Sequence, residues 1–181
     1  MSGLRRLIGL YTTLCAFGAG TMMVIVFAVI FFNSLGRYLF GGSLPWGEEA
    51  PVYLTIYGVM FGVTLGYLQD RHIAFTVVTD LFSRRSQRVL GRLVDLATLC
   101  TGSAFAVSGV MFAMKRGGIQ ASGLISSARD LAEATGIPGL EGLGFMGTWQ
   151  AAMPLGGILL AVAALLKLLS ALEERPWARE A

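Results

Sequence analysis

The chain has 181 residues, of which 55% are hydrophobic and only 14% charged, and its formal net charge is +3. Soluble domains carry about 25% charged residues, so this composition excludes an ordinary soluble globule and favours a single integral membrane domain. The positive charge is too small and too scattered for a nucleic-acid-binding surface. Cys15 and Cys100 lie in apolar runs without a metal-site or disulfide spacing, so we interpret them as small apolar residues.

The first predicted span is residues 7–32, which contain no charged side chain. Its length as a helix is about 39 Å, enough to cross a ~30 Å hydrocarbon core. The apolar run of a signal peptide is only about 7–15 residues long, so this segment is expected to remain as a spanning helix. We expect the chain to loosen at Asn33 and Ser34, which would place Arg37 beyond the helix end.

The second predicted span is residues 48–68, and it contains a regular row of glycines. Gly58, Gly62 and Gly66 follow one another at four-residue spacing, on one face of a helix. Small residues at this spacing allow two membrane helices to approach closely. The row therefore indicates a close helix contact, either within this chain or with a partner. The alternative is chance, because glycine is frequent in this sequence.

Residues 72–83 alternate apolar and polar side chains too often for a spanning helix, and arginines follow at once. This pattern predicts a short amphipathic helix lying in the membrane interface. The third span is expected at residues 89–114, of which the last 19 carry no charge. An ion pair between Arg92 and Asp95, three residues apart, is the simplest interpretation of the charges at its start.

Residues 115–147 interrupt the membrane pattern and form a long outer loop. A short surface helix is predicted at residues 128–135, with a capping box that begins at Ser127 and a stop at Gly136. The fourth span follows at residues 148–169. The predicted fold class is thus an all-α integral membrane protein with four transmembrane helices and one interfacial amphipathic helix.

The basic residues divide unevenly between the two sides of the membrane. With the N-terminus inside, the cytoplasmic segments hold Arg5, Arg6, Arg71, Arg84, Arg85, Arg88, Arg92, Lys167, Arg175 and Arg179, and the outer segments hold Arg37, Lys115, Arg116 and Arg129. Cytoplasmic loops are enriched in Lys and Arg. The bias predicts four spans with both termini in the cytoplasm.

Few residues suit catalysis or cofactor binding. The single histidine, His72, excludes a bis-histidine haem within this chain, and no phosphate-binding or hydrolase motif is present. His72 is interpreted as an interfacial anchor rather than a proton relay. Glu48 and Glu49 either complement the positive end of the helix dipole, or form ion pairs with Arg37 or with an arginine of a partner.

A set of these residues resembles the DctQ family, the small membrane subunits of tripartite ATP-independent periplasmic (TRAP) transporters. The residues are Gly36, Arg37, Tyr38, Phe40, Gly41, Pro45, Trp46, Glu48, Glu49, Gly62, His72 and Ile73, in this order. One acidic position of the family pattern is Thr76 here, and Asp80 matches a second one.

The resemblance implies an accessory, non-enzymatic subunit of the bacterial inner membrane, without a cofactor of its own. It would scaffold a large permease subunit, in which sodium coupling is expected, and would work with a periplasmic binding protein that delivers an organic anion. Membrane lipids are the remaining partners. Two alternatives stay open: the membrane anchor of a redox complex, which would need more histidines or a haem-binding partner, and a small homo-oligomeric exporter, which would need a carboxylate within a span.

Overall fold

The computed structural model describes residues 2–69 and 84–173, whose regular elements are all helices. Four helical segments are long and apolar enough to cross a membrane, which confirms the predicted fold class. The elements are α1 (Ser2–Phe40), α2 (Glu49–Leu68), α4 (Arg84–Arg116), α5 (Ile125–Thr135), the 3-10 helix η1 (Pro138–Gly144), α6 (Met146–Gln150) and α7 (Ala152–Glu173). The interfacial helix expected at 72–83, with His72 and Asp80, lies outside the described residues.

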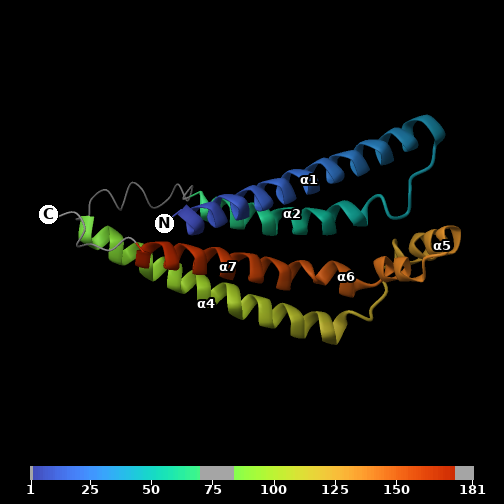
Figure 1. The fold of residues 1–181 in the computed structure, drawn as a ribbon. Helices are drawn as coiled ribbons and strands as arrows, with labels where there is room; N and C mark the ends of the chain where they lie inside the picture. The colour runs from blue at the N-terminus through green and yellow to red at the C-terminus, as the bar shows by residue number, and fades with distance from the viewer. Residues whose placement is uncertain (1, 70–83, 174–181) are drawn as a thin grey trace.

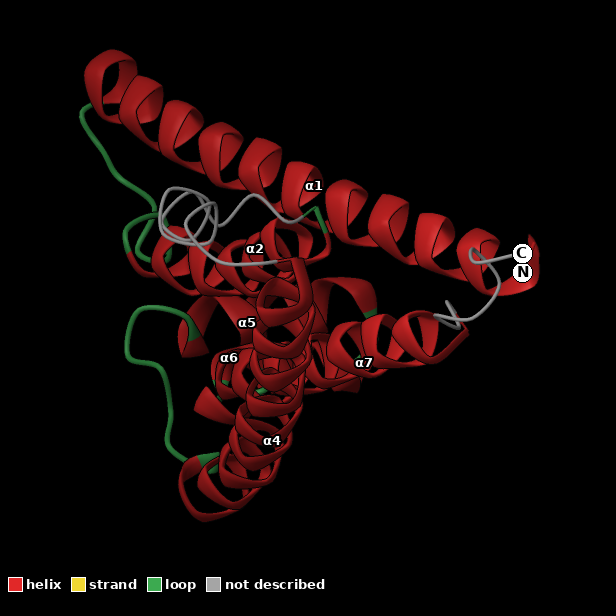
Figure 2. Ribbon diagram, turned by 90° about the vertical axis from the view of Figure 1, so that its left-hand side faces the viewer, coloured by secondary structure: helices red, strands yellow, loops and turns green. Residues whose placement is uncertain are grey.

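The spanning helices lie side by side in the order α1, α2, α7, α4, as Figures 1 and 2 show. α1 packs along α2, α2 also packs on α7, and α4 packs along α7. α1 also contacts α7 directly, since the Tyr11 hydroxyl donates a hydrogen bond to the Leu159 carbonyl oxygen at 2.8 Å. A buried cluster of Cys15, Tyr67, Leu68, Ala163 and Ala164 joins α1, α2 and α7, so the row is partly closed on this side. The two outermost helices, α1 and α4, expose most of their apolar side chains.

The two ends of the row differ (Figure 1). The terminal end contains Ser2 and Glu173, the first and last described residues. The loop end contains α5 and η1, which fold back over the ends of the spans. Both described chain ends thus lie on one side, as an even number of spans requires.

The first helix is longer than predicted, because Asn33 and Ser34 do not interrupt it. α1 continues to Phe40 and ends at Gly41, whose φ of +71° is the left-handed conformation that favours glycine. The side chain of Asn33 instead holds the following linker, since its Oδ1 accepts a hydrogen bond from the Leu44 N–H at 2.9 Å. The expectation that Arg37 follows the helix was wrong: Arg37 lies in the last turn of α1.

The outer loop is folded rather than irregular. Two of its segments pair through backbone hydrogen bonds, from Ala121 N–H to Gly144 O at 2.9 Å and from Met146 N–H to Ile119 O at 2.8 Å. α5 starts at Ile125, three residues before the predicted start, and no side chain caps it, so the predicted capping box at Ser127 was wrong. The predicted stop at Gly136 is confirmed by its left-handed φ of +68°.

A short interruption divides the fourth predicted span into α6 and α7 at Ala151. Pro154 accounts for it, because proline has no N–H to donate to the carbonyl of residue 150. The hydrogen bonds on either side, from Ala151 N–H to Gly147 O and from Leu155 N–H to Ala151 O, are both 3.1 Å long. The two helices therefore follow each other closely and complete one span from Met146 to Glu173.

Candidate subunit interface

The loop end is organised by an apolar cluster beneath the outer loop. Its buried members are Ala50 of α2 and Ala121 and Leu124 of the loop, and the partly buried Trp46, Tyr53, Met146 and Trp149 pack against them. The rings of Tyr53 and Trp149 stack with their centroids 5.4 Å apart. Trp46, predicted as an interface residue, therefore packs within its own chain. It fixes the loop over the start of α2.

Glu49 adds a polar connection to this cluster. Its carboxylate accepts hydrogen bonds from the Ser122 hydroxyl at 3.2 Å and from the Gly123 N–H at 3.3 Å. Gly123 also lies against Pro45: a Cβ on Gly123 would be 2.9 Å from the Pro45 carbonyl oxygen. Pro45 and Glu49 thus both hold the segment that leads into α5.

Arg37 does not join this connection. Within the described residues, no ion pair links Arg37 to Glu48 or to Glu49. Arg37 and Glu48 are both exposed, and the neighbours of Arg37 at the tip of α1 are among the most exposed apolar residues, with Tyr38 at 84% and Phe40 at 85%. The tip of α1 therefore presents a cation and two aromatic rings to its surroundings.

Among the residues that the structure describes, the glycine row of α2 makes only one close contact. A Cβ on Gly58 would lie 3.2 Å from the Met22 Cβ of α1, whereas one on Gly62 or Gly66 would meet no atom within 4 Å. The close approach of α1 to α2 is made instead at Gly18, where an added Cβ would lie 2.7 Å from the Phe61 ring. The chain leaves room beside Gly62 and Gly66.

The closest backbone approach of the spans lies elsewhere, between α4 and α7. A Cβ on Gly157 would lie 2.3 Å from Ala106 N, and a Cβ on Gly102 would lie 2.8 Å from Ala161 N. Sequence reasoning missed this contact, although a signal was present: Gly102 and Ala106, and Gly157 and Ala161, are pairs of small residues at four-residue spacing.

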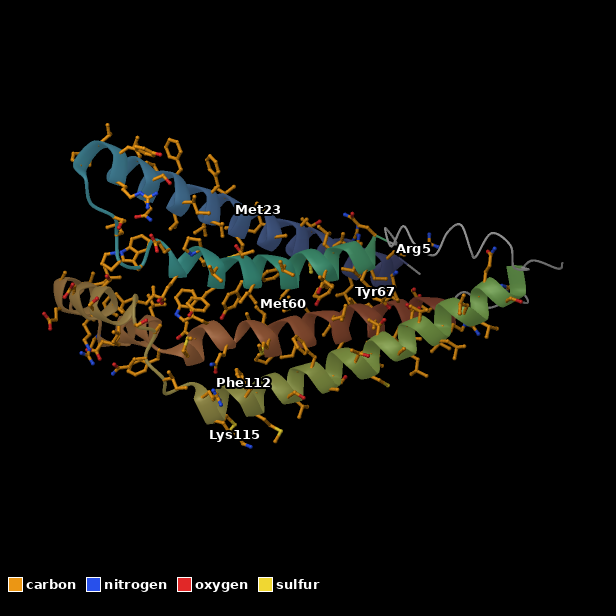
Figure 3. The ribbon with its side chains drawn as sticks, turned by 180° about the vertical axis from the view of Figure 1, so that it is seen from behind. Arg5, Met23, Met60, Tyr67, Phe112 and Lys115 are labelled. Carbon is orange, nitrogen blue, oxygen red and sulfur yellow. The ribbon has the colours of Figure 1, made fainter. Side chains whose placement is uncertain are left out.

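A second polar cluster joins three helices at the terminal end (Figure 3). The Tyr67 hydroxyl of α2 donates a hydrogen bond to Asp95 of α4, and the Lys167 Nζ of α7 lies 4.4 Å from the centroid of the Tyr67 ring. Asp95 was expected to pair with Arg92, but in the structure its carboxylate is turned to Tyr67. Asp95 and Lys167, both charged, thus enclose a tyrosine whose exposed fraction is only 4%.

The large uncovered surfaces are the outer faces of the row. On α1 they include Phe17, Met23, Val24 and Phe27, each about 70% exposed, and on α4 they include Val107 at 62% and Met114 at 81%. Within residues 2–69 and 84–173, no group of three or more His, Cys, Asp or Glu side chains is placed to hold a metal ion. The exposed apolar faces of α1 and α4 are suited to contacts with lipid and with other helices.

Comparisons with known proteins agree with this interpretation. A sequence model of the family described as "Tripartite ATP-independent periplasmic transporters, DctQ component" matches residues 23–174. The match covers all of α2, α4 and α7 and nearly half of α1, from residue 23 to its end.

One curated protein also shows similarity. The "Sialic acid TRAP transporter permease protein SiaT" of Haemophilus influenzae (strain 86-028NP) is 25% identical over 77 residues. These residues are 42% of this chain but only 12% of that protein, so the relative is several times longer.

Proposed function

The chain belongs to the DctQ component family of tripartite ATP-independent periplasmic transporters, and from this membership we propose how it acts within such a transporter. It is a multi-pass membrane component of a TRAP transporter, and its family implies association with a larger permease subunit. We infer that its own role is to bind that subunit and to enlarge its fixed scaffold, while solute and ions cross elsewhere.

One observation supports the scaffolding role above the others: the central parts of the spans carry no ionisable Asp, Glu, Lys, Arg or His. Residues 7–36, 50–68, 96–114 and 151–166 lack such side chains. Intramembrane charges mark ion and substrate pathways in transporters. Sodium coupling and recognition of an organic anion are therefore assigned to the larger subunit, and no enzymatic activity is expected of this chain.

The substrate class is proposed from the transporter type. The similar curated protein is named as a sialic acid permease, and sialic acid is a carboxylic acid. An organic anion, delivered by a periplasmic binding protein, is thus the proposed class. The identity of the anion would be set by the other two components.

Reconstitution tests the accessory role. Liposomes containing this chain alone, with a sodium gradient, a binding protein and candidate organic acids, are expected to show no uptake. Liposomes that also contain the large permease subunit of the same transporter are expected to accumulate the acid. Specific uptake by the chain alone would overturn the proposal.

The membrane orientation is a separate proposal, with both termini in the bacterial cytoplasm and the loop end facing the periplasm. The excess of Lys and Arg at the terminal end supports it. A reporter enzyme that is active only in the cytoplasm, fused after Ala181, is expected to be active. A reporter active only in the periplasm should be silent at the same position.

A further inference from the structure

The start of α4 carries a group of arginines that the scaffolding role does not use. Arg84, Arg85, Arg88 and Arg92 fall within nine residues. Arg5 and Arg6 of α1 lie at the same end of the row, where Figure 3 labels Arg5. The described acids of this end are Asp95, which accepts the hydrogen bond of Tyr67, and Glu173. Positive charge is therefore in excess at the terminal end.

This part of α4 projects beyond the helix that supports it. Gly102 of α4 lies against Ala161 of α7, and the two helices run in opposite directions. Glu173 comes twelve residues after Ala161, and Leu90 comes twelve residues before Gly102, so Glu173 and Leu90 lie at about the same level. Residues 84–89 thus extend past the last described turn of α7, as Figure 1 shows.

Arg92 lies at the depth of lipid headgroups. The charge-free part of α4, residues 96–114, has 19 residues. As a helix it is about 28 Å long, which nearly matches the ~30 Å hydrocarbon core. Arg92 is one turn outside this part, where the phosphates of a bilayer would be.

An apolar face accompanies the charge. Val89, Arg92 and Leu96 follow one another at spacings of three and four, so they share one side of the helix. Arg92 is exposed, and the exposed fractions of Val89, Leu93 and Leu96 are 52%, 57% and 51%. The guanidinium of Arg92 thus lies beside exposed apolar side chains. A phospholipid requires both, because its phosphate binds a cation and its acyl chain packs on an apolar surface.

We propose that residues 89–96 form a binding surface for an anionic phospholipid. Arg92 contacts the phosphate of the headgroup, and Val89 and Leu96 contact the start of an acyl chain. Guanidinium groups suit phosphate because they offer several donors in one plane. Basic clusters next to a spanning helix are attracted to anionic headgroups. With the proposed orientation, the lipid would belong to the cytoplasmic leaflet.

The test compares two variants of the full-length chain that each remove one positive charge from α4. Arg92→Gln changes the proposed surface, and Arg116→Gln changes the opposite end of the same helix, where the arginine is also exposed. Native mass spectrometry measures the dissociation constant for phosphatidylglycerol, against phosphatidylcholine as the neutral lipid. About fivefold weaker binding is expected for Arg92→Gln and less than about twofold for Arg116→Gln, given about fivefold per basic residue. Equal losses in the two variants would overturn the proposal.

Two further measurements identify the ligand. Val89→Ser/Leu96→Ser is expected to weaken binding of phosphatidylglycerol, and inorganic phosphate in millimolar excess is expected not to displace the lipid. If phosphate displaces it, the site is one for soluble anions and the lipid proposal fails. The proposal also fails if Arg92→Gln keeps its lipid but no longer co-purifies with the large subunit. Circular dichroism in phosphatidylcholine nanodiscs confirms that each variant is folded.

Discussion

The carboxylate of Glu49 accepts a hydrogen bond from the hydroxyl of Ser122, 3.2 Å away, although 73 positions separate the two residues in the chain. The same carboxylate accepts a second bond from the Gly123 N–H. The first turn of α2 is thereby joined to the segment that enters α5. A residue whose sequence position indicated only a helix-dipole or ion-pair role serves to attach the outer loop.

We expect Glu49→Ala to lower the free energy of unfolding by about 1–3 kcal/mol, because two hydrogen bonds to a charged group are lost. Its neighbour supplies the control: Glu48 is exposed, and exposed substitutions usually change stability by less than about 0.5 kcal/mol. Thermal unfolding of both variants in the same detergent measures the difference. Equal losses would show that the dipole, not the loop contact, accounts for Glu49.

A double-mutant cycle separates the two possible partners of Glu49. The substitutions Glu49→Ala and Ser122→Ala should couple by about 0.5 kcal/mol or more, since the two side chains are in contact. Glu49→Ala and Arg37→Ala should add within about 0.5 kcal/mol in the isolated chain, because no ion pair links them in the structure. Coupling of Glu49 with Arg37 that appears only when the large subunit is present would support an interface role for both.

Much of the fold could be predicted, because the membrane imposes lengths and polarity that are read directly from sequence. The second span was placed within one residue of α2. The end of α1 was not, because Asn33 was interpreted by its polarity, whereas its side chain bonds a residue eleven positions away. Such tertiary contacts override local preference and leave no periodic signal.

The candidate site was predicted less well for a similar reason. The glycine row of α2 was the most regular pattern in the sequence, yet Gly157, on another helix, makes the closest approach to the backbone of a neighbouring span. The spacing shows that one face of a helix carries small residues, but it does not show which helix packs against that face. Interface roles for Arg37, Glu48, Gly62 and Gly66 remain predictions that require the partner subunit.

Substitutions at the α4–α7 contact should be costly. In Gly157→Ala the new Cβ would lie 2.3 Å from the Ala106 nitrogen, a backbone atom that cannot turn aside. Overpacking of this kind typically costs about 1–3 kcal/mol. Gly20→Ala on α1 is a matched control, because its Cβ would meet no atom within 4 Å. Melting temperatures in detergent should fall for Gly157→Ala and stay unchanged or rise slightly for the control, because alanine is the better helix former.

The polar cluster of Tyr67, Asp95 and Lys167 predicts that removal of the tyrosine hydroxyl lowers the free energy of unfolding. Tyr67→Phe deletes the donor to Asp95 and leaves that carboxylate without its tyrosine partner. The expected loss is about 1–3 kcal/mol of unfolding free energy. The double substitution Tyr67→Phe/Asp95→Leu should regain part of it, because the stranded acceptor is then removed as well. A double variant that is less stable than Tyr67→Phe alone would contradict this explanation.

The last prediction concerns the open side of α2. Since a Cβ on Gly62 or Gly66 would meet nothing within 4 Å, the described residues 2–69 and 84–173 leave this small-residue face uncovered. Membrane helices gain packing where small residues allow backbones to approach, and the family implies a larger permease subunit as partner. A helix of that subunit is the proposed occupant.

Gly62→Leu and Gly66→Leu are therefore expected to leave the melting temperature of the isolated chain unchanged or slightly raised, because leucine is the better helix former. Co-purification with the large subunit should fall at least tenfold. Gly20→Leu, an equally open position on α1, adds the same side chain away from this face and should keep the partner bound. If all three variants retain the large subunit, the glycine face of α2 contacts lipid, and the partner must bind at the exposed surfaces of α1 or α4.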